Sequence, residues 1–481
     1  MPNAHQQTRT RIVATLGPAS WEPETLGRLI DAGVDVFRIN CSHSDPAMIR
    51  MQVARVRRAA YDRAAPIAIL LDLQGPKIRT GKVTEPLALG PGDVLTVVMD
   101  DEIIGHGHRV GTTYPQMAGD VHLGDRVLFA DGALSGTVCA VRMEKQPPEV
   151  DIRIRDGGKL GSHKGINLPG VKMSVPSLTE KDLADVELGV EMGVDYVALS
   201  FVRTAGDVED LRRHMARLGS DAPIIAKIEK PEALTNLDAI LEVAEGVMVA
   251  RGDLGVEVPL ETVPVHQKRI IAAAARRGRL VITATQMLDS MERNPRPTRA
   301  EVTDVANAIV DGTDAVMLSG ETSVGTWPIE SVRMMDAIAR SVESTDLLHP
   351  TAAADLPPMA GAAGLACRTA CIVAASTPMP VIVFTWSGAT AIFLSRARLR
   401  GPVFAMSPQQ KVVDRLSLAW GVRAMKIPMV HTFEELIATG ERVLLEGGLI
   451  RPGETVVVLG GNSPSAGSTS FVKFHVVSGP I

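Results

Sequence analysis

Short apolar runs alternate with amphipathic helical stretches from the start of the chain to about Ser344. Eight of these runs have the length and apolar content of buried strands. They are Arg11–Thr15, Val34–Ile39, Ile67–Asp72, Asp195–Ser200, Ile224–Ile228, Gly246–Ala250, Leu280–Ala284 and Asp314–Leu318. Strands that alternate with helices are typical of an α/β fold with a parallel sheet covered by helices. Eight such strands predict a closed (β/α)₈ TIM barrel.

The pattern changes between the third and fourth runs, over about residues 75–175. Short alternating strands are interrupted there by Gly, Pro and Asp, as in Gly90–Asp93 and Leu123–Asp125. This predicts an inserted all-β domain. The insert leaves the barrel just after the C-terminal end of a strand, on the rim where barrel enzymes carry their active sites. We therefore expect it to overhang that rim, either as a mobile lid or as a rigid addition.

A linker rich in Pro and Ala, Pro350–Pro358, precedes a second alternation of strands and helices. Its strand candidates are Val381–Thr385, Val403–Met406, Arg423–Ile427 and Thr455–Leu459, which predict a separate C-terminal α/β regulatory domain. The expected domains are the barrel at residues 1–74 and 176–345, the lid at 75–175 and the C-terminal domain at 346–481. Gly460–Ser470 is the one tract of low complexity.

Composition narrows the classes of protein that fit. The 481 residues are 45% hydrophobic and 22% charged, enough to bury the cores of several domains. No apolar stretch approaches the roughly 20 residues that cross a bilayer, and the polar, basic Met1–Arg11 has no apolar signal core, so we expect no membrane association and a cytoplasmic protein. A net charge of −5 without a basic tract, and 3% aromatic residues, argue against nucleic acid as a partner.

The cysteines give no metal or disulfide signature. Cys41, Cys139, Cys367 and Cys371 match no CxxC or zinc-ribbon spacing, so we expect reduced thiols. Cys367 and Cys371 are one helical turn apart in an Ala-rich stretch. A packed helix face is favoured there over a redox or metal-binding pair.

Polar and charged side chains gather at the predicted C-terminal strand ends. They are Arg38, Asn40, Asp72, Lys227, Glu229, Asp253, Thr285, Ser319 and Glu321. Phosphoryl transfer needs cations around the equatorial oxygens and a metal ion, with little covalent work by the protein. Arg38 and Lys227 can supply the cations. Glu229 and Asp253 offer the carboxylates that Mg²⁺ prefers, with Mn²⁺ as a substitute; an ion pair with Lys227 is the alternative for Glu229.

Two nucleotide-binding motifs are excluded. The segment Gly75–Val83 has five residues between its glycines and Val after the lysine, so it is not a Walker loop. A GxGxxG fingerprint is also absent, and nothing indicates a dinucleotide cofactor.

Several blocks of the sequence together resemble the pyruvate kinase family. They are Arg38–His43, Asp72–Arg79, Lys164–Gly170, Ala226–Glu229, Ala284–Leu288, Pro295–Glu301, Asp304–Ala308 and Met317–Thr322. The blocks follow the family's order and cover about residues 10–345 closely, while the C-terminal domain matches more loosely. The resemblance implies a glycolytic enzyme that transfers the phosphoryl group of phosphoenolpyruvate to ADP with Mg²⁺, giving pyruvate and ATP. It also implies a homotetramer.

The resemblance assigns roles to the residues at the rim. Lys227 would stabilise the transferring phosphoryl group and the enolate, and Arg38 would bind the substrate phosphate. Glu229 and Asp253 would hold the metal ion. The backbone amides of Gly252 and Asp253 and the hydroxyl of Thr285 would orient the substrate carboxylate, and Thr285 would also lie on the proton path. The positions that match the nucleotide side are Asn40, His43, Arg79 and Lys164.

One residue departs from the pattern of the K⁺-dependent members, in which Gly-Pro is followed by Glu. In those members K⁺ sits near residues that match Asn40, Ser42 and Asp72. Here Gly-Pro is followed by Lys77. A lysine ammonium is a compact fixed cation that can replace K⁺ and pair with Asp72. We therefore expect a requirement for Mg²⁺ but not for K⁺, unless Lys77 points to solvent and K⁺ still binds.

The C-terminal domain contains a hydroxyl-rich loop, Thr385–Thr390, between a strand and a helix. Thr385, Ser387 and Thr390 could cradle a phosphate at the helix start, and a plain helix cap is the alternative. In the family this loop binds the phosphate of an allosteric activator. Ala389 stands where members that respond to fructose bisphosphate often carry a basic residue, so a sugar monophosphate or AMP is at least as good a candidate.

Two other functions remain open from the sequence alone. A Mg²⁺-dependent barrel aldolase or lyase of pyruvate chemistry would share the acidic metal site, but it would not explain an insert that carries Arg79 and Lys164. A catalytically silent metabolite sensor would use the C-terminal domain. Its expected signature is loss of residues such as Lys227 or Thr285, and both are present.

Overall fold

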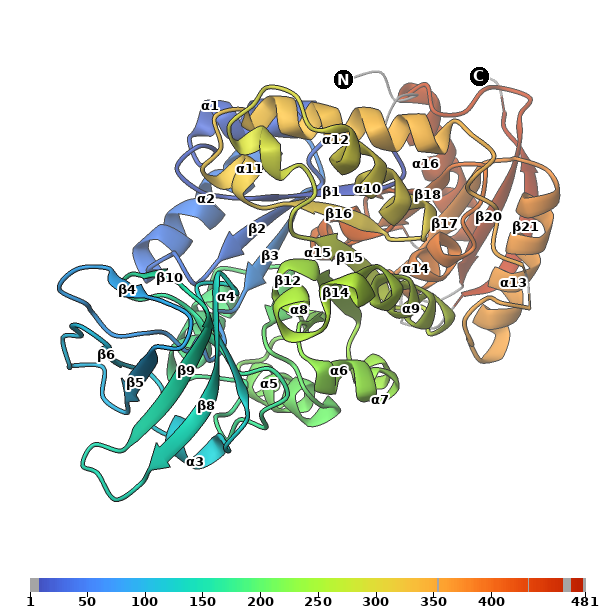
Figure 1. The fold of residues 1–481 in the computed structure, drawn as a ribbon. Coiled ribbons are helices and arrows are strands. Elements are labelled where there is room, and N and C mark those ends of the chain that lie inside the picture. The colour runs from blue at the N-terminus through green and yellow to red at the C-terminus, as the bar shows by residue number, and fades with distance from the viewer. Residues whose placement is uncertain (1–7, 353, 431, 462–468, 479–481) are drawn as a thin grey trace.

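Eight parallel strands form a closed barrel at the centre of the molecule, which confirms the predicted fold class (Figure 1). The computed structural model describes residues 8–352, 354–430, 432–461 and 469–478. Around the barrel the strands follow the order β1-β16-β15-β14-β13-β12-β3-β2. Their bounds are β1 (Arg11–Thr15), β2 (Val36–Asn40), β3 (Ala68–Asp72), β12 (Tyr196–Leu199), β13 (Ile224–Ile228), β14 (Gly246–Ala250), β15 (Leu280–Ala284) and β16 (Ala315–Leu318).

Helices surround the barrel strands and bury their apolar faces on them (Figure 1). The helices are α1 (Pro23–Ala32), α2 (Pro46–Asp62), α4 (Glu180–Glu191), α5 (Ala205–Arg217), α6 (Pro231–Thr235), α7 (Leu237–Val243), α8 (Arg251–Glu257), α9 (Val263–Arg276), α10 (Arg299–Val310), α11 (Gly320–Ser323) and α12 (Pro328–Glu343), with 3₁₀ turns η1 (Leu260–Thr262) and η2 (Asp289–Glu292). Local sequence determines where several of these helices begin. Thr179 and Thr298, for example, form capping boxes with Asp182 and Glu301.

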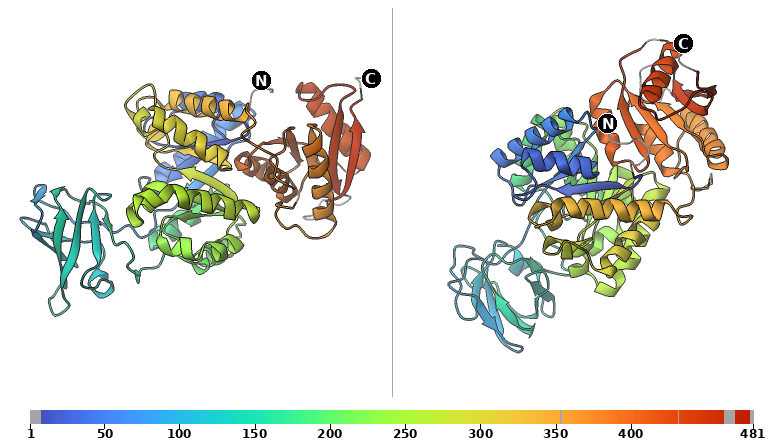
Figure 2. Two further views of the ribbon diagram at one scale, coloured as in Figure 1. Left: turned by 45° about the vertical axis from the view of Figure 1, so that its right-hand side comes forward. Right: turned by 90° about the horizontal axis from the view of Figure 1, so that it is seen from above.

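The inserted segment between β3 and α4 is almost entirely β-structure. A six-stranded sheet has the order β11-β7-β8-β9-β5-β6, and β10 pairs with β4. The elements are β4 (Leu87–Leu89), β5 (Val94–Val98), β6 (Arg109–Gly111), α3 (Met117–Asp120), β7 (Arg126–Phe129), β8 (Leu134–Arg142), β9 (Glu149–Asp156), β10 (Gly158–Leu160) and β11 (Ile166–Asn167). This domain stands away from the barrel on two connections (Figure 2).

The C-terminal domain is a five-stranded sheet of order β19-β18-β17-β20-β21 with helices packed on it. Its elements are α13 (Gly361–Ser376), β17 (Val381–Phe384), α14 (Ala389–Arg396), β18 (Val403–Ser407), α15 (Gln410–Arg415), η3 (Leu416–Leu418), β19 (Val422–Lys426), α16 (Phe433–Glu446), β20 (Thr455–Gly461) and β21 (Thr469–Val476). The prediction missed β21. It is an antiparallel edge strand whose Lys473 and His475 break the apolar pattern, and much of the low-complexity tract before it lies outside the described residues.

The C-terminal domain contacts the N-terminal ends of the barrel strands, opposite the rim. Asp314, just before β16, is fully buried and accepts hydrogen bonds from Arg396 and Arg398. Tyr196 in β12 donates its hydroxyl to the backbone oxygen of Arg415 at 2.6 Å. The inserted domain, the barrel and the C-terminal domain therefore follow one another along the molecule (Figure 2).

Cys367 and Cys371 are free thiols buried on α13. No cluster of three or more metal-ligating side chains was found among the described residues. In the same part of the chain, every helix is too short or too polar to cross a bilayer.

Candidate active site

A buried lysine is the centre of the charge network at the C-terminal end of the barrel. Lys227, near the end of β13, donates to Ser200 Oγ at 2.8 Å and lies 2.9 Å from Glu229 Oε1 and 3.4 Å from Asp72 Oδ1. Burial alone would lower its pKa, but Asp72, Glu229 and Asp253 together raise the pKa above the ordinary lysine value. Lys227 is therefore a fixed cation at neutral pH.

Arg38 and Asp72 place a second cation beside Lys227. The Arg38 guanidinium donates from Nε to Asp72 Oδ2 at 2.6 Å and from Nη1 to Thr15 Oγ1 at 3.1 Å. Burial pushes the pKa of Asp72 up, but Lys227 and Arg38 outweigh it and hold that pKa below the usual range. Asp72 thus stays ionised and orients both cations, which leaves them aimed at one region of the rim.

Glu229 and Asp253 form a pair of carboxylates that suits a divalent cation. Glu229 is buried, and its Oε2 accepts the backbone N–H of Phe201 at 2.9 Å. Burial and the charge of Asp253 raise its pKa, although Lys227 opposes them. A divalent cation would relieve this repulsion, and Mg²⁺ needs only one or two protein carboxylates besides water and substrate oxygens. The residues present therefore fit Mg²⁺.

The first turn of α8 and the strained loop after β15 meet beside these carboxylates. Thr285 has a φ of +68°, a left-handed conformation that is rare for a β-branched residue. Its hydroxyl accepts the backbone N–H of Gly252 at 2.7 Å and donates to the oxygen of Ala284 at 2.6 Å. Arg251 holds the same loop by donating to the backbone oxygen of Thr285 at 2.7 Å. The strain at Thr285 is therefore stabilised by its neighbours.

The predicted nucleotide-side residues lie on two separate parts of the structure. Asn40 ends β2, and its Oδ1 accepts the backbone N–H of Ser42 at 3.1 Å. His43 follows in the same loop, where burial and the nearby cations Lys77, Arg79 and Arg38 lower its pKa. A neutral imidazole is thus surrounded by cations.

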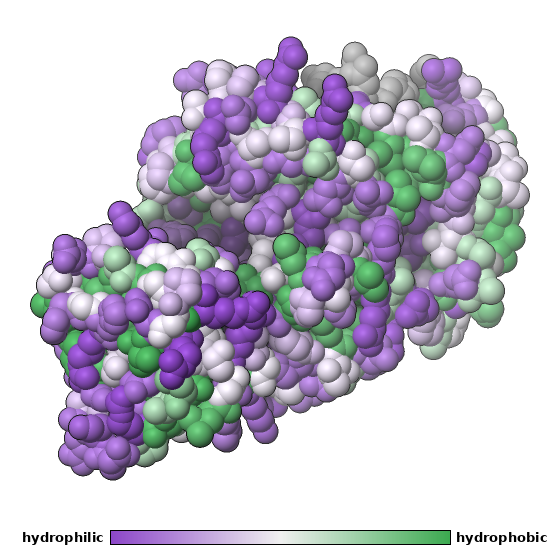
Figure 3. Space-filling view, viewed as in Figure 1, coloured by the Kyte–Doolittle hydropathy of each residue, from purple (hydrophilic) through white to green (hydrophobic). Residues whose placement is uncertain are grey.

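Arg79 and Lys164 are carried by the two connections of the inserted domain. The backbone of Arg79 bridges that of Gly165, and Thr80 N–H donates to the Lys164 oxygen at 2.8 Å. Lys164 is exposed, and Arg79 is half-buried. In the space-filling view the surface is hollowed between this domain and the barrel (Figure 3). These two cations would follow any movement of the inserted domain.

Lys77 is half-buried near the charged residues of the rim. Burial, Lys227 and Arg79 lower its pKa, and Asp253 and Asp72 oppose that shift. The charges of Asp253 and Asp72 thus act on its ammonium without outweighing burial and the neighbouring cations, and no ion pair of Lys77 within 4 Å occurs among the described residues.

The hydroxyl groups of the loop Thr385–Thr390 differ in their surroundings. Thr385 is buried and its Oγ1 accepts the N–H of Gly388 at 3.0 Å, while Thr390 is buried and bonded to Thr469 Oγ1 at 3.0 Å. Ser387 is exposed. Gly388, with a φ of +87°, precedes α14 and provides no side-chain cap. Of the three hydroxyl groups that the sequence suggested for a phosphate, the structure thus exposes only that of Ser387.

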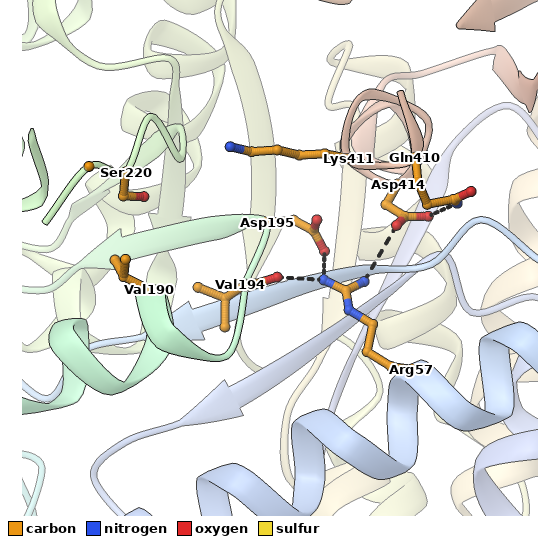
Figure 4. Close-up of a pocket in the computed structure, with 10 residues that line it drawn as sticks. Arg57, Val190, Val194, Asp195, Ser220, Gln410, Lys411 and Asp414 are labelled. Atoms are coloured by element: carbon orange, nitrogen blue, oxygen red, sulfur yellow. Dashed lines mark hydrogen bonds and ion pairs between the residues drawn. The ribbon is translucent and has the colours of Figure 1, made fainter. Parts of the chain in front are cut away.

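A cavity of about 430 Å³ lies far from the rim, between the barrel and α15 (Figure 4). Arg57 of α2 lines it and donates to Asp195 Oδ2 at 2.8 Å, while Asp414 of α15 lies 3.7 Å from the same guanidinium. Asp414 also accepts from Gln410 at 2.8 Å. Nothing in the sequence indicated this cavity, because its residues come from four separate segments of the chain.

Several residues around the site were not predicted. Ser200 and Phe201 follow β12 and contact Lys227 and Glu229, but a Ser-Phe pair carries no recognisable sequence signal. Glu321, expected at the rim, is instead buried and accepts the backbone N–H groups of Leu288 and Ser319. It therefore shapes the loops and does not face the site.

Comparison with known proteins identifies the family. The family described as pyruvate kinase, barrel domain, matches residues 7–332, and the one described as pyruvate kinase, alpha/beta domain, matches residues 363–475. This chain belongs to the pyruvate kinase family. It is therefore a phosphotransferase, as its charged rim predicted.

Individual relatives agree along the whole chain. Pyruvate kinase of Geobacillus stearothermophilus is 42% identical over 98% of this chain and 80% of its own length. Pyruvate kinase of Mycobacterium intracellulare is 42% identical over 97% of this chain and 98% of its own. The crystal structure of a pyruvate kinase from Cryptosporidium parvum matches with a TM-score of 0.91 and 32% identity, covering 99% of this chain and 97% of the other.

Proposed function

We propose that this protein transfers the phosphoryl group of phosphoenolpyruvate to ADP and protonates the resulting enolpyruvate to pyruvate. The observation that carries the proposal is the Lys227 ammonium held between Asp72 and Glu229 at the active rim of a pyruvate kinase barrel. The same family assignment favours kinase chemistry over the aldolase and lyase that the acidic site alone would allow.

In the proposed reaction the phosphorus–oxygen bond of phosphoenolpyruvate breaks while an oxygen of the ADP β-phosphate bonds to phosphorus. The bridging oxygen keeps the electron pair and becomes an enolate. Lys227 and Arg38 stabilise the charge on the equatorial oxygens and on this enolate, because both are preorganised by Asp72 and need no rearrangement during the transfer.

Glu229 and Asp253 would hold Mg²⁺, or Mn²⁺ in its place. When bound, the ion supplies positive charge to the substrate oxygens. The backbone N–H groups at the start of α8, next to Asp253, favour the substrate carboxylate there. Thr285 would release the Gly252 N–H to that carboxylate and use its hydroxyl, through water, to deliver a proton to the methylene carbon of the enolate.

Asn40, His43, Arg79 and Lys164 would bind ADP. Because Arg79 and Lys164 lie on the connections of the inserted domain, we propose that residues 75–175 form a lid whose closure brings these cations to the nucleotide. Closure would also exclude water from the phosphoryl group and suppress its hydrolysis.

The test is pyruvate formation from phosphoenolpyruvate and ADP, with Mg²⁺, with Mn²⁺, and with a chelator. We expect activity with either metal and none with the chelator. A protein that binds phosphoenolpyruvate but forms no pyruvate with either metal would refute the proposed reaction and favour the sensor. Retained activity in the chelator would refute the metal role of Glu229 and Asp253.

We further propose that the enzyme does not require K⁺. Support comes from Lys77, which is half-buried and near enough to Asp72 and Asp253 for their charges to act on its pKa. The wild type should be fully active in buffer without K⁺, and Lys77→Glu should gain a K⁺ requirement. Lys82→Glu makes the same charge change at an exposed lid position and serves as control. Strong K⁺ activation of the wild type would refute the replacement.

The loop Thr385–Thr390 is proposed to bind the phosphate of an allosteric effector, a sugar monophosphate or AMP. Ser387 is exposed beside the start of α14, and the absence of a basic side chain at Ala389 disfavours a bisphosphate. A double change of Ser387→Ala and Thr390→Ala should abolish activation by either compound. An unchanged response would refute the assignment.

We also propose a cytoplasmic, glycolytic homotetramer, as the family resemblance implies. Light scattering should give a mass four times that of the 51.2 kDa chain. A monomer at assay concentration would contradict this.

A further inference from the structure

Both connections of the inserted domain converge on one small cluster behind the metal-binding carboxylates. On the outgoing connection Gly75 has a φ of +66°, and a Cβ there would lie 2.6 Å from the Phe201 ring. The ring therefore packs directly on the backbone of this connection. On the returning connection β11 ends at Asn167, whose amide reaches the barrel.

The cluster is completed by a buried ion pair. Lys230 Nζ donates to Glu257 Oε1 at 2.7 Å, and the two side chains are 6% and 2% exposed. The Asn167 amide donates to the same Glu257 oxygen at 3.3 Å. Lys230 Nζ also lies 5.8 Å from the centre of the Phe201 ring, within the range of a cation–π contact.

Glu257 is incompletely satisfied in this arrangement. Among the described residues, its second oxygen, Oε2, is buried and has no hydrogen-bond partner. A buried carboxylate with an unfilled acceptor is costly, so a donor that approaches it is stabilised strongly. The Asn167 amide is the donor that can move toward Oε2. Its hydrogen bond to Glu257 is longer than that of Lys230, and it belongs to the inserted domain.

The members of the cluster are each attached to catalytic machinery. Lys230 directly follows Glu229 at the end of β13, and Glu257 ends α8, whose first turn contains Gly252 and Asp253. Asn167 is three residues from Lys164 on the lid. A change in the lid angle at Asn167 is thus transmitted to both metal-binding carboxylates through one ion pair.

We propose that Lys230, Glu257 and Asn167 are positioning residues that tie the lid to α8 and so set the geometry of the nucleotide site. They touch no reacting atom. The inference rests on the proposed transfer from phosphoenolpyruvate to ADP. It states how the lid residues of that reaction are kept in position relative to the rim.

Asn167→Ala tests the link between the domains with little effect on either core. Losing one hydrogen bond to a charged group should raise KM for ADP about tenfold, while kcat and KM for phosphoenolpyruvate change less than about twofold, because Glu229 and Asp253 keep their places. Lys159→Ala, at an exposed position of β10 in the inserted domain, is the matched control and should behave as wild type. An unchanged KM for ADP in Asn167→Ala would overturn the proposal.

A second variant separates positioning from simple stability. Replacing Lys230 by Met and Glu257 by Leu together removes the pair without leaving a buried charge, so the melting temperature should stay near that of the wild type. KM for ADP should still rise about tenfold, since Asn167 has lost its acceptor. Normal KM for ADP in a stable double variant would show that the pair is only structural.

Hydrogen exchange gives a readout that does not depend on turnover. Amides at residues 75–81 and 164–172 should exchange faster in Asn167→Ala than in wild type and in Lys159→Ala. Equal exchange in the three proteins would count against the link. A wild type without kinase activity would refute the proposed function alone, because these exchange rates would still report on the connection.

Discussion

Replacement of Asp414 by Asn is expected to stabilise the protein at neutral pH. Asp414 lies on α15 at the cavity between the barrel and the C-terminal domain (Figure 4). Burial raises its pKa from 3.8 to about 6, and the neighbouring carboxylate of Asp195 adds to the shift. Arg57 opposes the shift only in part, because it bonds Asp195 at 2.8 Å and remains 3.7 Å from Asp414.

The pKa shift gives both the size and the sign of the effect. The fold binds the Asp414 proton more tightly than the unfolded chain, so the stability that this proton provides is lost as the pH rises from about 4 to above 6. The difference between a pKa of 3.8 and one of about 6 corresponds to about 3 kcal/mol at pH 7 and to about 1 kcal/mol at pH 4.5. Asn avoids this penalty and can still accept the hydrogen bond from Gln410.

The assay is urea unfolding of wild type and Asp414→Asn between pH 4.5 and 8. The variant should be more stable by up to about 3 kcal/mol at pH 7, and the gap should narrow toward pH 4.5. Asp221→Asn is the control on the same interface. Hydrogen bonds from Lys411 and Arg415 outweigh burial and lower the pKa of Asp221 to about 2, so its largely exposed carboxylate contributes stability that is lost only toward pH 2. Its loss should therefore cost up to about 1 kcal/mol at pH 7.

A variant Asp414→Asn that is no more stable than wild type at pH 7 would refute this reasoning. A stability gain that does not change with pH would also refute it, because the cause would then not be the ionisation of Asp414. If Asp221→Asn were stabilising as well, removal of any negative charge from the interface would explain both results.

Three further changes have defined outcomes. Asp314→Ala leaves two arginines of the C-terminal domain buried without their partner, and urea unfolding should show a loss of about 3–5 kcal/mol. Lys227→Met should lower kcat about 10²–10³-fold in the phosphoenolpyruvate and ADP assay, since one preorganised cation at the reacting oxygens is lost. Gly75→Ala should destabilise the protein by at least about 1 kcal/mol, because the new Cβ meets the Phe201 ring at a positive φ, and an unchanged melting temperature would contradict this close contact.

The barrel could be predicted because all eight of its strands are short, apolar and separated by helical sequence. The observed bounds differ from the predicted ones by one or two residues at several ends. Asp195 and Asp314 were counted as strand residues, for example, but they precede β12 and β16 and bind backbone amides or arginines. Their charge was the sequence feature that could have shown that they lie outside the buried strands. The edge strand β21 was missed because most of its residues are exposed or only partly buried and Lys473 and His475 break the apolar pattern.

The site residues could be predicted one at a time, since each follows a strand that points to the same rim. The contacts between these residues could not be predicted from the sequence. Lys227 contacts Asp72 and Ser200 through strands that are distant in sequence, and the left-handed backbone of Phe201 and Thr285 has no composition signal when the residue is not glycine. The same limit applies to Glu257, which looks like an ordinary helix-end carboxylate until the fold brings Lys230 and Asn167 to it.

The interior of the barrel and the core of the C-terminal domain form one apolar cluster. It includes Met248 and Ala284 inside the barrel and Leu394 and Leu416 in the C-terminal domain. Ala284 immediately precedes the strained Thr285, and Leu394 lies on α14, which begins at the proposed effector loop. Close-packed interiors transmit displacement and do not absorb it. The proposed effector loop is therefore joined to the residue proposed to deliver the proton by continuous packing, whereas the proposed nucleotide site and lid lie at the other end of the barrel.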